Sequence, residues 1–174
     1  MPDSRRGIRI VDGQPQVVAD DWCLIEGSEQ WDACAAGRRP LVPLELARSQ
    51  AQRAHQDSGW GVWLEPDDDP ALAVEFFPQL ALIGVHFPKF TDGRGYSTAV
   101  LLRTRYGWRG ELRALGDVLQ DQLHALRRVG FDSFALRADR DPQSALRGFT
   151  PFSDAYQGSV DQPLPAFRRA GAAS

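Results

Sequence analysis

The sequence is poor in cysteine and histidine, and both shortages exclude classes of site. The two cysteines, Cys23 and Cys34, form no Cys-x-x-Cys motif and no iron–sulfur spacing. We interpret them as buried or idle thiols, with a redox role as the alternative. The three histidines, His55, His86 and His124, lie far apart without a His-Glu-x-x-His or Cys/His ligand spacing, so no metal site is expected. His86 lies in an apolar run, and we interpret it as a core histidine.

Long apolar runs and an excess of positive charge are also lacking. No apolar run approaches the roughly 20 residues that span a bilayer, and Met1–Arg6 does not lead into a secretory signal. We therefore expect a cytoplasmic protein without a membrane partner, in which no disulfide forms. The net charge is −3, whereas nucleic-acid binders usually carry a basic stripe, so no nucleic-acid partner is predicted. The absence of a Gly-x-Ser-x-Gly elbow argues against a serine hydrolase.

Length and composition favour a single folded unit. The 174 residues are 43% hydrophobic and 25% charged, as in ordinary globular domains. A chain of this length buries about two-thirds of its unfolded surface, so it needs no disulfide or metal to fold. We expect one α/β domain over residues 1–160. The end of the chain is rich in Pro, Gly, Ser and Ala, and a disordered tail is predicted over residues 161–174.

Strands and helices are predicted to alternate along most of the chain. A hairpin within about residues 8–25 is indicated by Asp12-Gly13 between the apolar runs Ile8–Val11 and Gln16–Ala19. Further strands are expected near residues 60–64, 81–87, 111–115 and 133–137, and helices over residues 44–56, 71–80, 98–106, 118–128 and 142–148. Because strands joined through helices pair in parallel, the predicted fold is α/β. It has a mostly parallel sheet of repeated βα units, either an open sheet or a partial barrel, after a short β-rich N-terminal segment.

A charged stretch, FPKFTDGRGYS, directly follows the apolar run 81–87. Ligands of parallel α/β sheets bind beyond the carboxyl ends of the strands, where this stretch would lie. It contains the one lysine among the 20 basic residues, and the loops after neighbouring strands add carboxylates. A helix N-terminus beside Lys and Arg side chains suits a small anion. The candidate ligand- or partner-binding residues are Lys89, Asp92, Arg94, Tyr96, Arg113, Asp117, Asp121 and Glu65, with Asp67, Asp139 and Asp141 on the same rim.

Other interpretations of this stretch stay open. Asp-Gly is a common turn sequence, and the residues after it can simply cap a helix. The charges can also pair among themselves, with Arg94 or Arg113 bound to Asp92, Asp117 or Asp121. The Gly-Arg-Gly segment is neither the dinucleotide fingerprint nor a phosphate loop, so no cofactor is evident.

One long run resembles a known family. Residues 87–136, FPKFTDGRGYSTAVLLRTRYGWRGELRALGDVLQDQLHALRRVGFDSFAL, closely resemble a family of uncharacterised bacterial proteins. Weaker similarity covers DGQPQVVADDW (12–22), GVWLEPDDDP (61–70) and FSDAYQG (152–158). Members are commonly encoded beside the siroheme-containing sulfite reductase of sulfate assimilation. From that gene neighbourhood they are labelled as oxidoreductases of sulfite reduction. No catalytic residue is established for them, and many have a cysteine where this chain has Val129.

The resemblance implies an accessory protein of assimilatory sulfite reduction. Such a protein would bind the sulfite reductase or its electron donor and assist electron delivery, assembly or substrate supply. The alternative is a stand-alone enzyme or small-anion-binding domain. There, Lys89 and Arg94 would hold an oxyanion such as sulfite or phosphate, Asp92 or Asp117 would handle protons, and Tyr96 would orient the ligand. Whether the chain is itself an enzyme stays open, as does a homo-oligomer.

Overall fold

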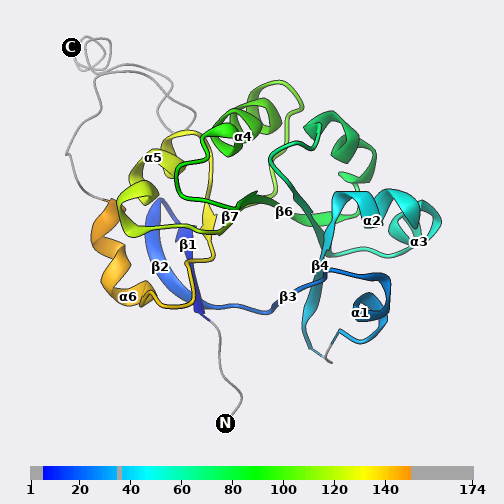
Figure 1. Ribbon diagram of the computed structural model, residues 1–174, viewed down its shortest axis with the longest axis horizontal. Coiled ribbons are helices and arrows are strands. Elements are labelled where there is room, and N and C mark those ends of the chain that lie inside the picture. Colours follow the sequence, from blue (N-terminus) through cyan, green and yellow to red (C-terminus); the bar gives the residue numbers. More distant parts are fainter. Residues whose placement is uncertain (1–5, 35–36, 150–174) are drawn as a thin grey trace.

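The computed structural model describes residues 6–34 and 37–149, whose strands form one mixed, eight-stranded sheet curled into a half-barrel (Figure 1). The strand order is β2-β1-β8-β7-β6-β5-β4-β3. The strands are β1 (Arg6–Val11), β2 (Gln14–Ala19), β3 (Trp22–Leu24), β4 (Arg39–Pro43), β5 (Trp60–Leu64), β6 (Leu80–Phe87), β7 (Glu111–Gly116) and β8 (Ser133–Phe134). The tail expected over residues 161–174 lies outside the described residues.

The strands from β3 to β8 run parallel to one another. β6 is buried along nearly its whole length, because it lies between β5 and β7 and packs on both of its faces. The strands predicted near residues 60–64, 81–87 and 111–115 are β5, β6 and β7. The one predicted over 133–137 is shorter, since β8 consists of Ser133 and Phe134.

The N-terminal hairpin makes the sheet mixed, which corrects the expectation of a mostly parallel sheet. β1 and β2 pair antiparallel through a turn in which Asp12 and Gly13 have φ values of 50° and 77°, as the Asp-Gly sequence predicts. β1 also pairs antiparallel with β8, with Ile8 opposite Phe134. The backbone groups at the edge of β8 are satisfied in this way. The hairpin therefore extends the sheet instead of forming a separate segment.

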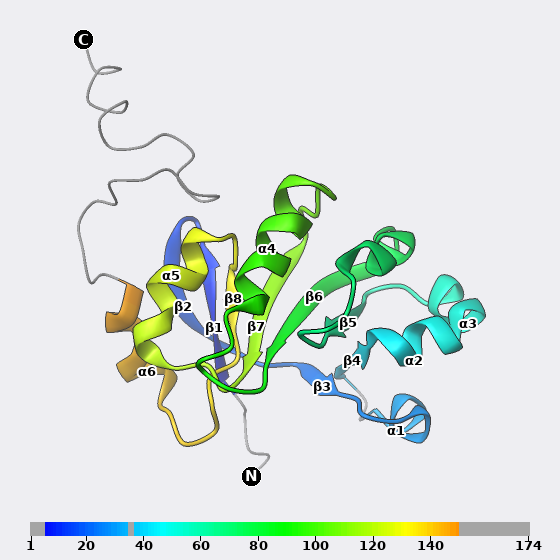
Figure 2. The same ribbon diagram turned by 45° about the horizontal axis from the view of Figure 1, so that its top comes forward.

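Two residues, Asp20 and Asp21, connect the opposite edges of the sheet. β2 is one edge strand and ends at Ala19, and β3 is the other edge strand and begins at Trp22. Three Cα–Cα steps reach at most about 11 Å, so the two edges approach each other at this corner. The short connection accounts for the curl, and Figure 2 shows β3 leaving the hairpin and crossing to β4.

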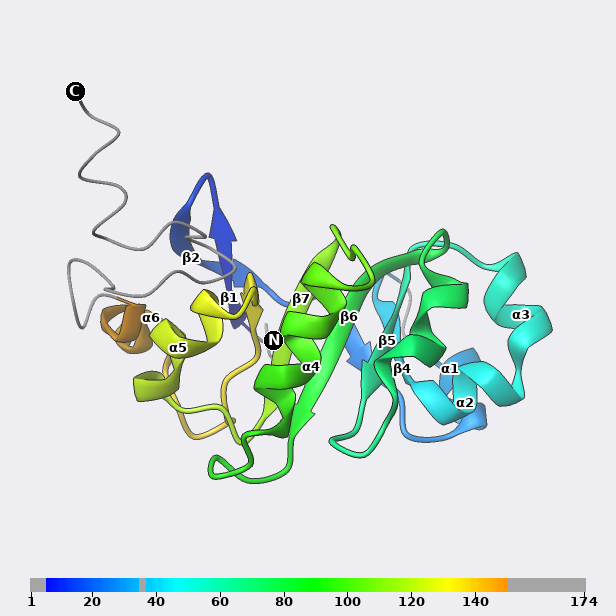
Figure 3. The same cartoon turned by 90° about the horizontal axis from the view of Figure 1, so that it is seen from above.

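The helices lie on the outer side of the curl (Figures 1 and 3). They are α1 (Ser28–Asp32), α2 (Leu44–Ser49), α3 (Ala51–Gln56), α4 (Arg94–Thr104), α5 (Leu123–Arg128) and α6 (Pro142–Ala145), with the 3₁₀ helices η1 (Pro70–Phe76), η2 (Gln120–Gln122) and η3 (Leu146–Phe149). None of these described helices is long and apolar enough to cross a membrane.

The two faces of the sheet have separate hydrophobic clusters. The larger cluster includes Ile83, Val85 and Phe87 of β6. Leu82 of the same strand belongs to a smaller cluster with Leu115 of β7. Because side chains alternate along a strand, every second residue of β6 faces the inner side of the curl.

Several predicted helices are interrupted or more tightly wound than expected. Residues 44–56 form α2 and α3, separated at Gln50, whose φ and ψ are −115° and 39°. η1 is a 3₁₀ helix, with Pro70 in its first turn as expected. α4 begins at Arg94, four residues before the predicted start. Apolar spacing located these helical segments, but it does not distinguish short 3₁₀ turns from α-helix.

Candidate functional site

The parallel strands all end on one side of the sheet, beyond which the sequence places most of the candidate residues. Leu64 is paired with Val85 and Phe87 with Gly116, so the loops after β5, β6 and β7 are neighbours. The side of the sheet where these strands end, which we call the rim, carries Glu65, Lys89, Asp92, Arg94 and Asp117. Tyr96 and Asp121 follow on α4 and η2.

Arg94 is paired with two carboxylates of the rim. Its Nη2 atom lies 2.6 Å from Oδ2 of Asp92, and its Nη1 atom is bonded to Asp67 from the loop after β5. The Arg94 guanidinium holds the pKa of Asp92 at about 2, below the usual 3.8. The expected pairing of Arg94 with Asp92 is therefore present, and the pairing with Asp67 was not predicted. Much of the positive charge expected to attract an anion is already neutralised.

The loop between β6 and α4 is held in place from two sides. Asp117 Oδ2 accepts a hydrogen bond from the Phe90 N–H at 3.0 Å, and Gln122 Nε2 donates to the Phe90 carbonyl oxygen at 2.8 Å. The Asp92 N–H closes a turn onto the Lys89 carbonyl oxygen at 2.9 Å. The backbone is thus fixed, yet the Phe90 residue is 53% exposed. Lys89 is also exposed.

Tyr96 and Asp121 lie near Gln122, which holds this loop, and the Tyr96 phenol is hydrogen-bonded to the Gln122 side chain. The Tyr96 ring packs edge-on against Phe87, with ring centroids 5.8 Å apart, and burial raises the pKa of the Tyr96 phenol. Asp121 is exposed and lines a separate cavity of about 260 Å³, together with Asp139 and Asp141. The Tyr96 ring therefore helps to pack α4 against β6.

Arg113 does not lie on the rim, and its expected pairing with Asp92, Asp117 or Asp121 is wrong. It lies inside β7 and is 3% exposed. Its Nη1 atom is 2.7 Å from Asp20 Oδ1, its Nη2 atom is 3.2 Å from Glu111 Oε1, and Nε donates to Ser133 Oγ at 2.9 Å. The side chain faces the inner side of the curl because it is two residues before Leu115 on the same strand. Arg113 consequently binds residues of the sheet and of its closing link.

A cavity of about 670 Å³ lies at the carboxyl ends of the strands from β3 to β7. Its apolar wall is formed by Leu24, Pro43, Leu46, Trp63 and Leu115. Its polar lining consists of Glu26, Glu45, Ser49, Glu65, Asp68 and His86. Glu26, Glu45 and Asp68 were not among the residues predicted from the sequence. The available signal was a glutamate one or two residues after each of β3, β4 and β5.

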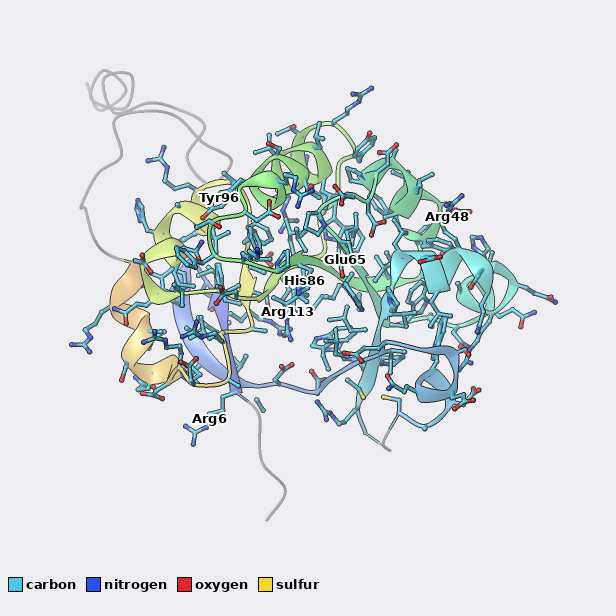
Figure 4. All side chains as sticks on the ribbon, viewed as in Figure 1. Arg6, Arg48, Glu65, His86, Tyr96 and Arg113 are labelled. Carbon is cyan, nitrogen blue, oxygen red and sulfur yellow. The ribbon has the colours of Figure 1, made fainter. Side chains whose placement is uncertain are left out.

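His86 and Glu65, which lie side by side (Figure 4), form a polar contact in this cavity. The His86 Nδ1 atom lies 2.8 Å from Glu65 Oε2, and the imidazole meets the Trp63 ring edge-on at 5.6 Å. Since a carboxylate only accepts hydrogen bonds, Nδ1 carries the proton, and Nε2 is the acceptor of the neutral ring. An imidazole oriented by a carboxylate is suited to proton transfer. His86 was expected in the core, but its side chain is 28% exposed on the inner face.

Negative charge predominates in the cavity. Burial raises the pKa of Asp68, and the nearby charges of Glu65 and Glu45 raise it further, although the Glu65 N–H donates to Asp68 Oδ2 at 2.7 Å. Among the described residues that line the cavity, His86 is the one whose side chain can become positive. Within residues 6–34 and 37–149, no three His, Cys, Asp or Glu side chains are grouped to hold a metal ion. The cavity thus combines an apolar wall with carboxylates.

A family model described as "Bacterial protein of unknown function (DUF934)" matches residues 61–167. The match includes β5 except Trp60, all of β6 to β8, the rim, and the His86–Glu65 pair. No curated protein and no solved structure matches the chain.

Proposed function

The chain belongs to the DUF934 family, and we propose that it acts as an accessory protein of assimilatory sulfite reduction that binds the sulfite reductase or its electron donor. The resemblance of residues 87–136 to proteins encoded beside that reductase supports the role. The loop between β6 and α4, whose backbone is held by Asp117 and Gln122, is the proposed place of contact. The assistance would consist of electron delivery, assembly or supply of substrate.

The observation that carries the proposal is the exposure of Phe90 on a fixed backbone. Large aromatic side chains are frequent anchors of protein interfaces. Asp117 and Gln122 already hold both backbone groups of Phe90, so little loop entropy remains to be lost on binding. Lys89 stands beside it and adds a positive charge at the tip. The tip therefore suits a partner with an apolar pocket and an acidic border.

Calorimetry with the sulfite reductase and with its electron donor tests this proposal. We expect one of the two to bind the wild type, and Phe90→Ala to weaken binding by about ten-fold or more. Leu72→Ala is the matched control, because Leu72 is also an exposed apolar side chain, 37% exposed, but lies on η1. Absence of binding to both proteins would reject the accessory role. Equal effects of the two substitutions would reject the rim as the contact.

A stand-alone oxyanion site on the rim is the second candidate, supported by Lys89. Within the described part of the chain no ion pair engages Lys89, whereas Arg94 is committed to Asp92 and Asp67. An oxyanion would bind Lys89 and compete with those carboxylates for Arg94. Titration with sulfite, sulfate and phosphate should then give saturable heat that Lys89→Met abolishes. Heats indistinguishable from dilution for all three anions would eliminate this candidate.

A further inference from the structure

We propose that the cavity at the carboxyl ends of β3 to β7 binds a small organic cation, an ammonium or guanidinium group carried on an apolar body. The site is distinct from the Phe90 contact and does not depend on the proposed partner. Three features of the cavity favour such a ligand: its apolar wall, the placement of its carboxylates and the charge balance of its lining.

The apolar wall is preformed. Gly84 leaves room for two side chains, since a Cβ there would lie 2.4 Å from Leu115 Cδ2 and 3.1 Å from Trp63 Cβ. The Trp63 indole N–H donates to the Ile25 carbonyl oxygen at 3.3 Å, which fixes the ring. Leu24 is 44% exposed where it lines the cavity. A volume of about 670 Å³ falls in the range of small-molecule sites, which are mostly apolar with a few placed polar groups.

The carboxylates converge because of the parallel topology. Glu26, Glu45 and Glu65 follow β3, β4 and β5, whose carboxyl ends lie at one edge of the sheet. In the described residues no cation pairs with Glu26 or Glu45, although most carboxylates of the rim are engaged. Glu65 is oriented by His86. Two carboxylates therefore remain available to a ligand beside an aromatic wall.

The charge balance selects the ligand. Four carboxyl side chains and one imidazole line the cavity, so an anion would be repelled and a cation attracted. Ammonium and guanidinium groups form charge-assisted hydrogen bonds with carboxylates, and an aromatic ring such as Trp63 favours a nearby cation. The raised pKa of Asp68 reflects the same negative environment. Burial raises it first, and the charges of Glu65 and Glu45 raise it further because they disfavour another negative charge. A bound cation would relieve that repulsion.

Three probes of one shape and different charge test the proposal on the full chain. Phenethylamine, phenethyl alcohol and hydrocinnamate share a phenylalkyl body and are cationic, neutral and anionic. By calorimetry we expect phenethylamine to bind saturably, the alcohol about ten-fold more weakly and hydrocinnamate not at all. The indole N–H resonance of Trp63 should shift with phenethylamine.

Two variants locate the charge contact. Glu45→Gln should weaken phenethylamine several-fold, because it removes one of the available carboxylates of the lining. Glu29→Gln is the matched control, since Glu29 is an exposed glutamate on α1 that does not line the cavity. Phe90→Ala, which should weaken the proposed partner complex, should leave amine binding unchanged.

The proposal is overturned if phenethylamine does not bind, or if the alcohol or hydrocinnamate binds as tightly. It is also overturned if Glu45→Gln has no more effect than Glu29→Gln. Loss of amine binding in Phe90→Ala would place the ligand at the exposed tip of the loop between β6 and α4 instead of in the cavity. These results are independent of reductase binding, so either proposal can fail without the other.

Discussion

The Nη1 atom of Arg113 lies 2.7 Å from Oδ1 of Asp20, and this ion pair joins β7 to the link that connects the two edges of the sheet. The two side chains are 4% and 14% exposed. Arg113 also contacts Glu111 and Ser133, so most of its donors are satisfied. The pair holds the link against the inner face and thereby supports the curl on which the cavity depends.

Removing Arg113 should therefore destabilise the whole sheet. Arg113→Met leaves the largely buried Asp20 without its cation, whereas Glu111 keeps its ion pair with Arg9. Loss of one partner of a buried pair costs about 3–5 kcal/mol, which we expect as a decrease in the free energy of unfolding, measured in urea. Arg113→Met with Asp20→Asn should lose less than the sum of the two single changes. Additive losses would show that the two side chains do not stabilise each other.

Two glycines of the rim motif should respond differently to alanine. A Cβ at Gly95 would lie 2.5 Å from Cζ of Phe87, whereas none of the atoms around Gly93 comes within 4 Å. Phe87 is 1% exposed and cannot move aside, so Gly95→Ala should lower the free energy of unfolding by about 1–3 kcal/mol. Gly93→Ala should stay within about 0.5 kcal/mol of wild type. The free energy of unfolding of both variants is measured in urea. Similar decreases in the two variants would contradict the close approach of α4 to β6.

Gly116 should prove necessary for the position of His86. Its φ is 99°, and a Cβ would lie 2.4 Å from the Phe87 carbonyl oxygen and 2.7 Å from His86 Cδ2. Gly107 has a φ of 71° but open space around it, which makes it the control for backbone strain alone. Both alanine variants should lose about 1 kcal/mol or more from strain. Only Gly116→Ala should shift the imidazole resonances of His86, and an unchanged His86 spectrum would disprove the contact.

The pairing of Arg94 and Asp92 predicts a pH dependence of known sign. The folded-state pKa of Asp92 is about 2, below the usual 3.8, so the ionised form is favoured by folding. Its contribution to stability is present above pH 3.8 and is lost as the pH falls through about 2. Arg94→Ala should return the Asp92 pKa toward its usual value in a carboxyl NMR titration. Arg137→Ala should leave it unchanged, because Arg137 pairs with Asp117 and Asp139. A low Asp92 pKa in the Arg94 variant would assign the shift to another cause.

Local patterns determined several elements of this fold. The hairpin turn follows from Asp12-Gly13, since both residues accept a positive φ. The strand β6 followed from a continuous apolar run, and the position of Arg94 and Asp92 on the rim followed from that strand's end. Their pairing was also predictable, because the two residues are only two positions apart.

Pairings between distant residues were not predictable in this way. The Arg113–Asp20 pair joins residues 93 positions apart. The antiparallel contact of β1 with β8, which makes the sheet mixed, likewise joins the first described strand to the last. No short pattern encodes which edge a hairpin will join, because that choice depends on which edge remains open when the sheet assembles.

Local sequence patterns located the hairpin, the strands β5 to β7 and the rim loop, and they placed charged residues after those strands. The long-range packing of the fold brings Glu26, Glu45, Glu65 and His86 to one cavity and places Arg113 inside the sheet. A strand that is buried on both faces has apolar residues at nearly every position, so its sequence does not show which face His86 occupies. The curl of the sheet, closed by a two-residue link, then gives that inner face its cavity.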